Sequence, residues 1–209
     1  HVNAPFREPL YPKSDTNWSY SDTIRVIDQY TPDYDLTEKQ KEFVEAIWPS
    51  NYRVLIVAGQ QDLNHDQVDL LKSFARNYHI PILGDVISNM HPIDSAISHA
   101  DLFLSQASEN LKKTLTPDLL ITFGGSIISK HVKNFLREHP AKTHWHIQCT
   151  GMVPDTYQSV SGIFNANTTT FFNFLSSLPR LENFESQKQQ NYEKLWEVEE
   201  RRALRSLDN

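Results

Sequence analysis

The chain has 209 residues, of which 39% are hydrophobic and 11% aromatic, which is enough for one large α/β domain and excludes a disordered chain. Twenty basic residues against 26 acidic residues leave a net charge of −6, so we expect no surface for nucleic acid or anionic membranes. The single cysteine, Cys149, excludes an intrachain disulfide and a zinc site of paired thiols. Because no apolar run could cross a bilayer, we expect a cytoplasmic protein.

The two ends of the chain differ in composition from its middle. Three prolines within the first twelve residues restrict the backbone to extended conformations. We therefore expect residues 1–35 to form an inter-domain connector and loop, and residues 36–180 to form a central α/β domain. Residues 181–209 are predicted to be a helical segment leading to another domain. The start at His1 and the charged C-terminal pattern suggest a piece of a longer protein.

The first predicted helix begins at Thr37, which has the spacing of a capping box with Gln40. Apolar residues recur at helical spacing after it, and Pro49 is expected to end the helix. The continuous apolar run 53–59 then predicts a strand that is covered on both faces. The apolar residues of the helix that begins after Thr37 are Phe43, Val44, Ile47 and Trp48.

A second capping box is predicted from Asn64 and Gln67, before a helix whose buried face carries Val68, Leu71, Phe74 and Ala75. Further strands are predicted at 80–85, 118–124, 144–148 and 160–164. The segment 100–104 is a short helix or turn. A helix after the third strand carries Ile128, Val132, Phe135 and Leu136, and a last packed helix spans 168–178 with Phe171, Phe172 and Leu175.

This alternation of strands and helices predicts the fold class. Strands separated by helices of 10–15 residues require crossover connections, which are right-handed almost without exception. We expect an α/β fold with a doubly wound, mostly parallel sheet of five or six strands and helices on both faces. Ligands of such sheets bind beyond the carboxyl ends of the strands, so the strand-to-helix corners are the candidate sites.

The first two corners carry weak signals. Gly59 stands alone after the first strand, without the G-x-G-x-x-G pattern of dinucleotide-binding turns, and we interpret it as a strand-end turn. Asp85 ends the second strand. It could hold a hydroxyl group or a metal, or cap the next helix, and the sequence favours the structural role.

The third corner is the strongest candidate. Gly124 and Gly125 allow a tight turn, and Ser126 leads into a predicted helix whose N-terminal amides could bind an anion. A lysine at a helix N-terminus is unfavourable unless something compensates, and an anionic ligand shared with Lys130 would do so. A solvated surface lysine remains the alternative. The spacing of a phosphate-binding P-loop is absent from the sequence.

Histidines and the cysteine give no site of their own. His144 and His146 share one face of a predicted strand, but Cys149 has the opposite parity and no third zinc ligand lies nearby. We interpret the histidines as packing residues and Cys149 as a small buried side chain. No nucleophile, base and oxyanion site can be assembled from this sequence, so it indicates a binding or scaffolding layer.

The residues 3–11, Asn-Ala-Pro-Phe-Arg-Glu-Pro-Leu-Tyr, resemble the connector after the first domain of 2-succinyl-5-enolpyruvyl-6-hydroxy-3-cyclohexene-1-carboxylate synthases. The segments 54–59, 81–85 and 118–130 follow in the order of that family's central domain. The resemblance covers nearly the whole chain and is weakest at 150–209. It implies a Rossmann-like central domain between two outer domains, with Arg7 of the connector docking against a neighbour.

The resemblance also implies a function. The family consists of thiamine-diphosphate-dependent transferases of menaquinone biosynthesis, which decarboxylate 2-oxoglutarate and add the resulting carbanion equivalent to isochorismate. Thiamine diphosphate and Mg²⁺ (or Mn²⁺) would be bound by the outer domains and not by this chain, which alone would be inactive. The whole protein would be a homodimer or homotetramer.

In that family a pair of basic residues at the start of the helix after the third corner faces the substrate carboxylates. Here the resemblance assigns substrate binding to Lys130 and His131, with the neighbouring Ser129. The lysine matches the family, whereas His131 departs from its usual arginine because it lacks the guanidinium fork. Two alternatives stay open: the central domain of an acetolactate synthase-like enzyme, which would hold a flavin or nucleotide, and a non-enzymatic module that binds a small ligand.

Overall fold

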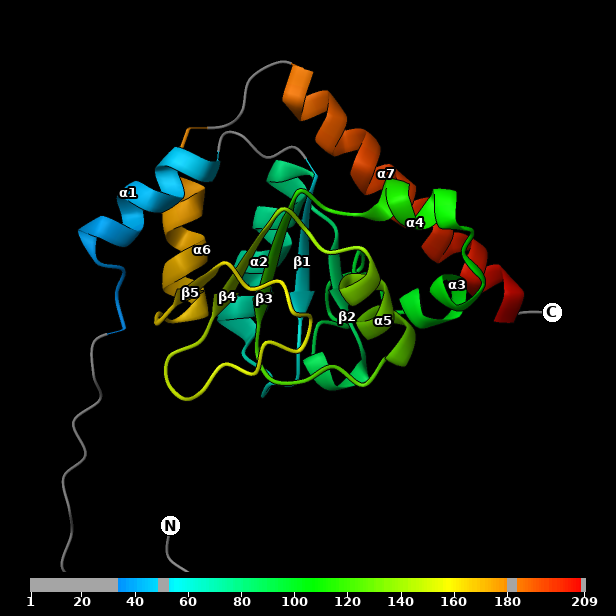
Figure 1. Cartoon of the computed structure of the whole chain (residues 1–209). Helices are drawn as coiled ribbons and strands as arrows, with labels where there is room; N and C mark the ends of the chain where they lie inside the picture. The colour runs from blue at the N-terminus through cyan, green and yellow to red at the C-terminus, as the bar shows by residue number, and fades with distance from the viewer. Residues whose placement is uncertain (1–33, 49–52, 180–183, 208–209) are drawn as a thin grey trace, which may run out of the picture. The chain divides into compact units, whose positions relative to one another are not determined.

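The computed structural model describes residues 34–48, 53–179 and 184–207 (Figure 1). The predicted connector with Arg7 and the helix stop at Pro49 lie outside the described residues. The helices are α1 (Glu38–Ile47), α2 (His65–Tyr78), the 3₁₀ helix η2 (Val86–Ser88), α3 (Ala100–Gln106), α4 (Glu109–Leu115), α5 (Lys130–Glu138), α6 (Thr168–Ser177) and α7 (Phe184–Leu207). The strands are β1 (Val54–Ala58), β2 (Ile82–Gly84), β3 (Leu119–Phe123), β4 (Thr143–Ile147) and β5 (Gly162–Phe164).

The five strands form one parallel sheet in the order β2-β1-β3-β4-β5. Ile56 of β1 lies opposite Ile82 on one side and Ile121 on the other, and Ile121 lies opposite Trp145. Every residue of β1 and β3 is buried, as expected for strands covered on both faces. The predicted doubly wound sheet is confirmed, with five strands, all of them parallel.

Two hydrophobic cores cover the two faces of the sheet. Ile56 and Ala58 of β1 pack into the core that includes α1, α2 and α6. Leu55 and Val57, which alternate with them, pack into the core that includes α3, α4, α5 and α7. Figure 1 shows these two groups of helices on opposite sides of the sheet. The result is a three-layer α/β arrangement.

Several local predictions are confirmed and three are corrected. Thr37 forms the capping box of α1 as expected. Asn64 caps α2, but the Gln67 side chain donates to Gln61 Oε1 instead of closing a second box. Ile128 is 58% exposed and precedes α5, so it is not part of that helix's buried face. The helix α4, capped by Ser108, was missed.

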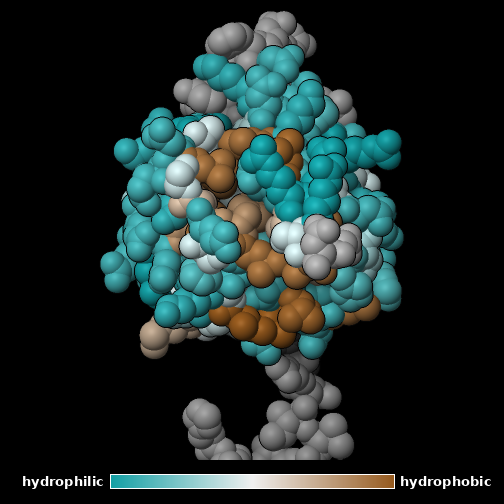
Figure 2. Space-filling model, turned by 90° about the vertical axis from the view of Figure 1, so that its right-hand side faces the viewer, coloured by the Kyte–Doolittle hydropathy of each residue, from teal (hydrophilic) through white to brown (hydrophobic). Residues whose placement is uncertain are grey.

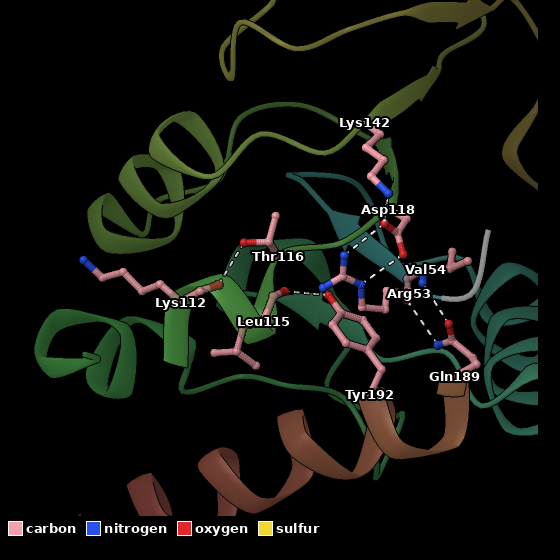
Figure 3. Close-up of polar contacts among 9 residues, drawn as sticks. All are labelled: Arg53, Val54, Lys112, Leu115, Thr116, Asp118, Lys142, Gln189 and Tyr192. Atoms are coloured by element: carbon pink, nitrogen blue, oxygen red, sulfur yellow. Dashed lines mark hydrogen bonds and ion pairs between the residues drawn. The ribbon is translucent and has the colours of Figure 1, made fainter. Parts of the chain in front are cut away.

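The C-terminal helix α7 belongs to the packing of this domain. Tyr192 and Trp196 are buried in the second core, and the Tyr192 hydroxyl donates to the Leu115 carbonyl at 2.7 Å. The Gln189 side chain accepts from Val54 N at 2.8 Å and thereby ties α7 to the start of β1 (Figure 3). The two aromatic residues of α7 therefore seal the sheet of their own domain.

The face formed by α3, α4 and α7 carries exposed apolar surface. Figure 2 views the molecule from this side and shows a band of hydrophobic surface flanked by hydrophilic side chains. Leu102 on α3 and Val198, Leu204 and Leu207 on α7 are exposed large apolar residues. None of the described helices is long and apolar enough to cross a membrane.

Candidate functional site at the carboxyl edge of the sheet

The strand order changes direction at β1 and β3: β2 is added on one side of β1, and β3, β4 and β5 follow on the other side. Ligands of doubly wound sheets bind at such a switch point. Here the loops that follow the two strands are bonded to each other. Gly59 N donates to Phe123 O at 2.8 Å, Gly125 N donates to Gln60 O at 2.8 Å, and Gln60 N donates to Ser126 O at 3.2 Å. These three backbone bonds close the crevice in which a dinucleotide would lie. The three backbone amides therefore already donate to carbonyl groups and are not available to a ligand.

Glycine is required at this contact. A Cβ atom at Gly59 would lie 1.9 Å from the Gly125 carbonyl oxygen, which is far inside any real contact distance. Gly124 has φ of +77°, and its added Cβ would lie 2.9 Å from the Gly59 carbonyl oxygen. Gly59 is therefore more than the strand-end turn that we predicted: it allows two backbones to approach closely.

The helix α5 begins later than the sequence suggested. Its first residue is Lys130 and its N-cap is Ser129, so Gly124, Gly125 and Ser126 lie in the loop before it. The expectation that these three residues form the helix N-terminus is wrong, because the loop first bonds to the Gly59 corner. Their part in binding a ligand stays a prediction.

Asp101 of α3 anchors the start of α5. Its Oδ1 accepts from the Ser129 hydroxyl and from His131 N, the latter at 3.0 Å, while Ser129 Oγ accepts from Val132 N at 3.1 Å. Burial raises the pKa of Asp101, but the hydrogen bonds from Ser129 and His131 outweigh it and lower that pKa below its ordinary value. A charged carboxylate at a helix N-terminus is stabilised by the helix dipole. Asp101 lies 28 residues before Ser129, and sequence reasoning missed it because no local pattern links the two.

The arrangement leaves the Lys130 side chain exposed. Within the part of the chain that the structure describes, the Lys130 ammonium has no ion-pair partner. His131 is half-buried, one position further along the helix. Asp101 and Ser129 hold the start of the helix that carries Lys130, and its exposed ammonium is available to an anion.

A small cavity of about 40 Å³ lies between the loop after β3 and the segment after β4. Such a volume holds water molecules and is too small for a cofactor. Neither Lys130 nor His131 is among its lining residues. The residues that line it are Val57, Gly59, Thr122, Phe123, Gly125, Ser126, His144, His146, Pro154, Thr156, Tyr157 and Val160.

The two histidines of β4 meet at Thr122 of β3. Thr122 Oγ1 lies 2.8 Å from His144 Nε2 and 2.8 Å from His146 Nδ1. Burial lowers the pKa of His144 to about 4 and lowers the pKa of His146 as well, so both rings are neutral at neutral pH. Their role as packing residues is confirmed for His144, which is 1% exposed. Among the described residues, no three or more His, Cys, Asp or Glu side chains are grouped to hold a metal ion.

The other two singled-out side chains also have structural partners. Asp85 makes no capping bond to η2, and its Oδ2 instead accepts from Ile128 N, which ties the loops after β2 and β3 together. Its Oδ1 is buried without a hydrogen-bond partner among the described residues. Cys149 is half-buried rather than buried, with Sγ 3.7 Å from the Ala166 carbonyl oxygen.

A larger hollow of about 420 Å³ lies away from these loops, beside α7. Arg53, Thr114, Lys188, Asn191, Tyr192 and Leu195 line it. The Arg53 guanidinium there binds the Asp118 carboxylate through two bonds of 3.0 Å (Figure 3). This hollow lies at the amino end of the sheet, which in doubly wound folds is not the ligand-binding edge.

Residues 28–205 match a protein family described as the middle domain of thiamine pyrophosphate. The chain belongs to this family. It is also similar to curated proteins named 2-succinyl-5-enolpyruvyl-6-hydroxy-3-cyclohexene-1-carboxylate synthase. The protein of Cytophaga hutchinsonii is 32% identical over 82% of this chain, that of Flavobacterium johnsoniae is 33% identical over 95%, and that of Porphyromonas gingivalis is 34% identical over 75%. The matched region is 30%, 35% and 26% of the length of these three relatives, so the chain spans between about a quarter and a third of each.

Proposed function

We propose that this chain is the middle domain of a 2-succinyl-5-enolpyruvyl-6-hydroxy-3-cyclohexene-1-carboxylate synthase, a transferase of menaquinone biosynthesis. Membership of the middle-domain family and similarity to curated proteins of that name over most of the chain support the proposal. The observation that carries the role of this domain is the exposed Lys130 ammonium at the start of α5. The whole protein would act in the cytoplasm as a homodimer or homotetramer.

The proposed substrates explain why a cation is needed. Both 2-oxoglutarate and isochorismate carry two carboxylates. The first loses CO₂, and its remaining four-carbon unit is joined to the second. Lys130 would bind a substrate carboxylate, with His131 and Ser129 beside it. A cation at that position holds a carboxylate by a charge-assisted hydrogen bond and fixes its orientation.

The carboxyl edge does not fit thiamine diphosphate. A diphosphate needs free backbone amides at a strand-to-helix corner, but Gly59 N, Gln60 N and Gly125 N donate to carbonyl groups of the facing loop. We therefore propose that thiamine diphosphate and its Mg²⁺ or Mn²⁺ are held by parts of the protein outside this chain. The same closed crevice argues against a flavin or nucleotide, as an acetolactate synthase-like middle domain would require. Bound elsewhere, the cofactor would supply the electron sink for decarboxylation.

Kinetics of the full-length enzyme test the proposal. Lys130→Ala should lower kcat/KM for one of the two substrates by about tenfold or more, which corresponds to about 1.4 kcal/mol. The affinity for thiamine diphosphate should stay unchanged, because the cofactor is bound elsewhere. His131→Ala should show a smaller loss for the same substrate, since an imidazole ring is a weaker anion ligand than an ammonium group.

Lys133→Ala is the matched control, because Lys133 lies one turn further along the same helix. Its kinetics should equal those of the unaltered enzyme. If Lys130→Ala leaves kcat/KM for both substrates unchanged, or if Lys133→Ala lowers it equally, Lys130 does not contact substrate.

A further inference from the structure

Five side chains form a continuous hydrogen-bonded row on the face of the sheet that α5 covers. His144 Nδ1 lies 2.9 Å from Ser159 Oγ, and Thr122 Oγ1 lies between the two imidazoles at 2.8 Å from each. His146 Nε2 lies 3.2 Å from Gln148 Oε1. Thr122 and His146 are direct partners in the register of β3 and β4. The row begins and ends on the segment after β4 and crosses β3 in between.

The donor and the acceptor of each hydrogen bond in the row can be assigned. Gln148 Nε2 donates to the Gly151 carbonyl at 2.8 Å, which turns Oε1 toward His146. An amide oxygen can only accept, so His146 Nε2 carries the ring proton and His146 Nδ1 accepts from the Thr122 hydroxyl. Thr122 has a single proton and must accept from His144 Nε2. The remaining acceptor, His144 Nδ1, then takes the Ser159 proton. Both neutral imidazoles are therefore Nε2–H tautomers.

The row connects the two ends of the segment 148–161, which joins β4 to β5. Gln148 is the first residue of this segment and Ser159 lies near its last. Ser161 adds a bond from its backbone N to the His144 carbonyl at 2.9 Å. From the other side, Arg137 of α5 donates to the Thr156 carbonyl at 2.7 Å. The segment is thereby attached both to the sheet and to the helix that begins with Lys130.

The same segment is one wall of the carboxyl edge. Thr156 and Tyr157 face the cavity across from Gly125 and Ser126 of the loop after β3. The width of the space between the two walls depends on where the segment is held. Tyr157 is 8% exposed. Its burial raises the pKa of the hydroxyl to about 12, and the Asp85 carboxylate makes a smaller contribution in the same direction. Tyr157 therefore keeps its proton and adds no charge to this wall.

We propose that Thr122, His144 and His146 are positioning residues of the substrate site: their directional row of hydrogen bonds holds the segment 148–161 at a set distance from the Gly125–Ser126 loop. The proposal rests on the function proposed above for this edge. The three residues touch no reacting atom. They act on substrate through the segment that they hold, because Arg137 bonds this segment to α5, the helix that begins with Lys130, and a displaced helix start misorients what Lys130 binds.

Nitrogen-15 NMR of histidine-labelled protein tests the row without any substrate. The two ring nitrogens of a neutral imidazole differ strongly in chemical shift, so the tautomer of each ring is read directly. We expect His144 and His146 to be Nε2–H tautomers. Thr122→Val removes the acceptor of the His144 Nε2 proton and should release the fixed tautomer of His144, whereas Thr122→Ser, which keeps the hydroxyl, should preserve it. A Nδ1–H tautomer at either ring would overturn the assigned direction.

Gln148 provides a second pair of variants at the half-buried end of the row, where folding is less at risk. Gln148→Glu keeps an acceptor toward His146 Nε2 and should preserve the tautomer. Gln148→Met removes that acceptor, and the His146 ring should then no longer be held in one tautomer. If both variants behave alike, the Gln148 end does not set the direction.

Kinetics of the full-length enzyme test the consequence. Thr122→Val should raise KM for a substrate on the order of tenfold with a smaller change in kcat, and Thr122→Ser should restore KM. Loss of the tautomers with unchanged KM would overturn the positioning role. If Thr122→Val raises KM while Lys130→Ala changes nothing, the row stands and the assignment of Lys130 fails instead.

Discussion

The two edges of the sheet are held together by different kinds of bond. At the amino edge, side chains distant in sequence meet: Asp118 binds Arg53 through two bonds of 3.0 Å and Lys142 through one of 3.0 Å, and Gln189 of α7 bonds to Val54 (Figure 3). At the carboxyl edge, the loops after β1 and β3 are joined by hydrogen bonds between their backbones.

In our proposal, this difference separates the residues that stabilise the fold from those that bind a ligand. The Asp118 side chain is 4% exposed, and its charge is balanced by partners within the domain. Burial raises the pKa of Asp118, but Arg53 and Lys142 outweigh it and hold that pKa below its ordinary value. At the carboxyl edge, the Lys130 side chain pairs with no described carboxylate and stays exposed. This exposed cation is the residue for which we propose substrate binding.

The largest expected loss of stability follows from removing the ion pair between Asp118 and Arg53 at the amino edge. Asp118→Ala leaves the half-buried Arg53 guanidinium without its carboxylate and should lower the free energy of unfolding by about 3 kcal/mol. Urea denaturation followed by circular dichroism measures this value.

Two lysine variants calibrate that result. Lys142→Ala removes a partner of Asp118 whose side chain is 74% exposed, and it should cost less than about 1 kcal/mol. Lys130→Ala, at the other edge, should change stability by less than about 0.5 kcal/mol. A loss of several kcal/mol for Lys130→Ala would contradict the separation of the two edges.

The second effect is a pH dependence from the buried His144. Its pKa falls from 6.5 in the unfolded chain to about 4 in the fold, so the unfolded state binds the extra proton between these values. Stability should therefore be highest above pH 6.5 and fall by up to about 3 kcal/mol as the pH decreases to 4. Comparing the slope of stability against pH with that of His144→Asn cancels the contributions of other groups. Equal slopes would show that His144 titrates normally.

The third effect tests the contact between the two glycine loops. Gly59→Ala forces its Cβ against the Gly125 carbonyl oxygen, and the overpacking should cost about 2 kcal/mol. Gly125→Ala is the matched control, because its Cβ would meet no atom closer than 3.4 Å. Thermal unfolding of both variants should give a lower Tm for Gly59→Ala alone. Equal values of Tm would mean that the loops are not joined as described.

Much of the fold could be predicted because its signals are local. The apolar run at 54–58 and the pairing of Thr37 with Gln40 each lie within a few residues of chain. The short helix α4 was missed because it buries little beyond Leu115. The candidate Lys130 was found through a family resemblance and its place at a strand-to-helix corner, and the structure gives it an exposed position.

The supporting residues of the site could not be predicted, because each acts over a long separation. Asp101 reaches Ser129 from another helix, and Thr122 joins two histidines more than 20 residues away. The parity of His144 and His146 was visible in the sequence, but not the hydroxyl between them.

The sequence alone determined the alternation of strands and helices, the parallel sheet that follows from it, and the corner where a cation stands. Hydrophobic periodicity and helix capping act between near neighbours, and such interactions are readable along one dimension. The tertiary structure decided that the β1–β3 crevice is closed, that α7 packs onto its own domain, and that the His144–Thr122–His146 row has a direction. These outcomes depend on which groups meet across the sheet, and only the folded chain brings them within hydrogen-bond distance.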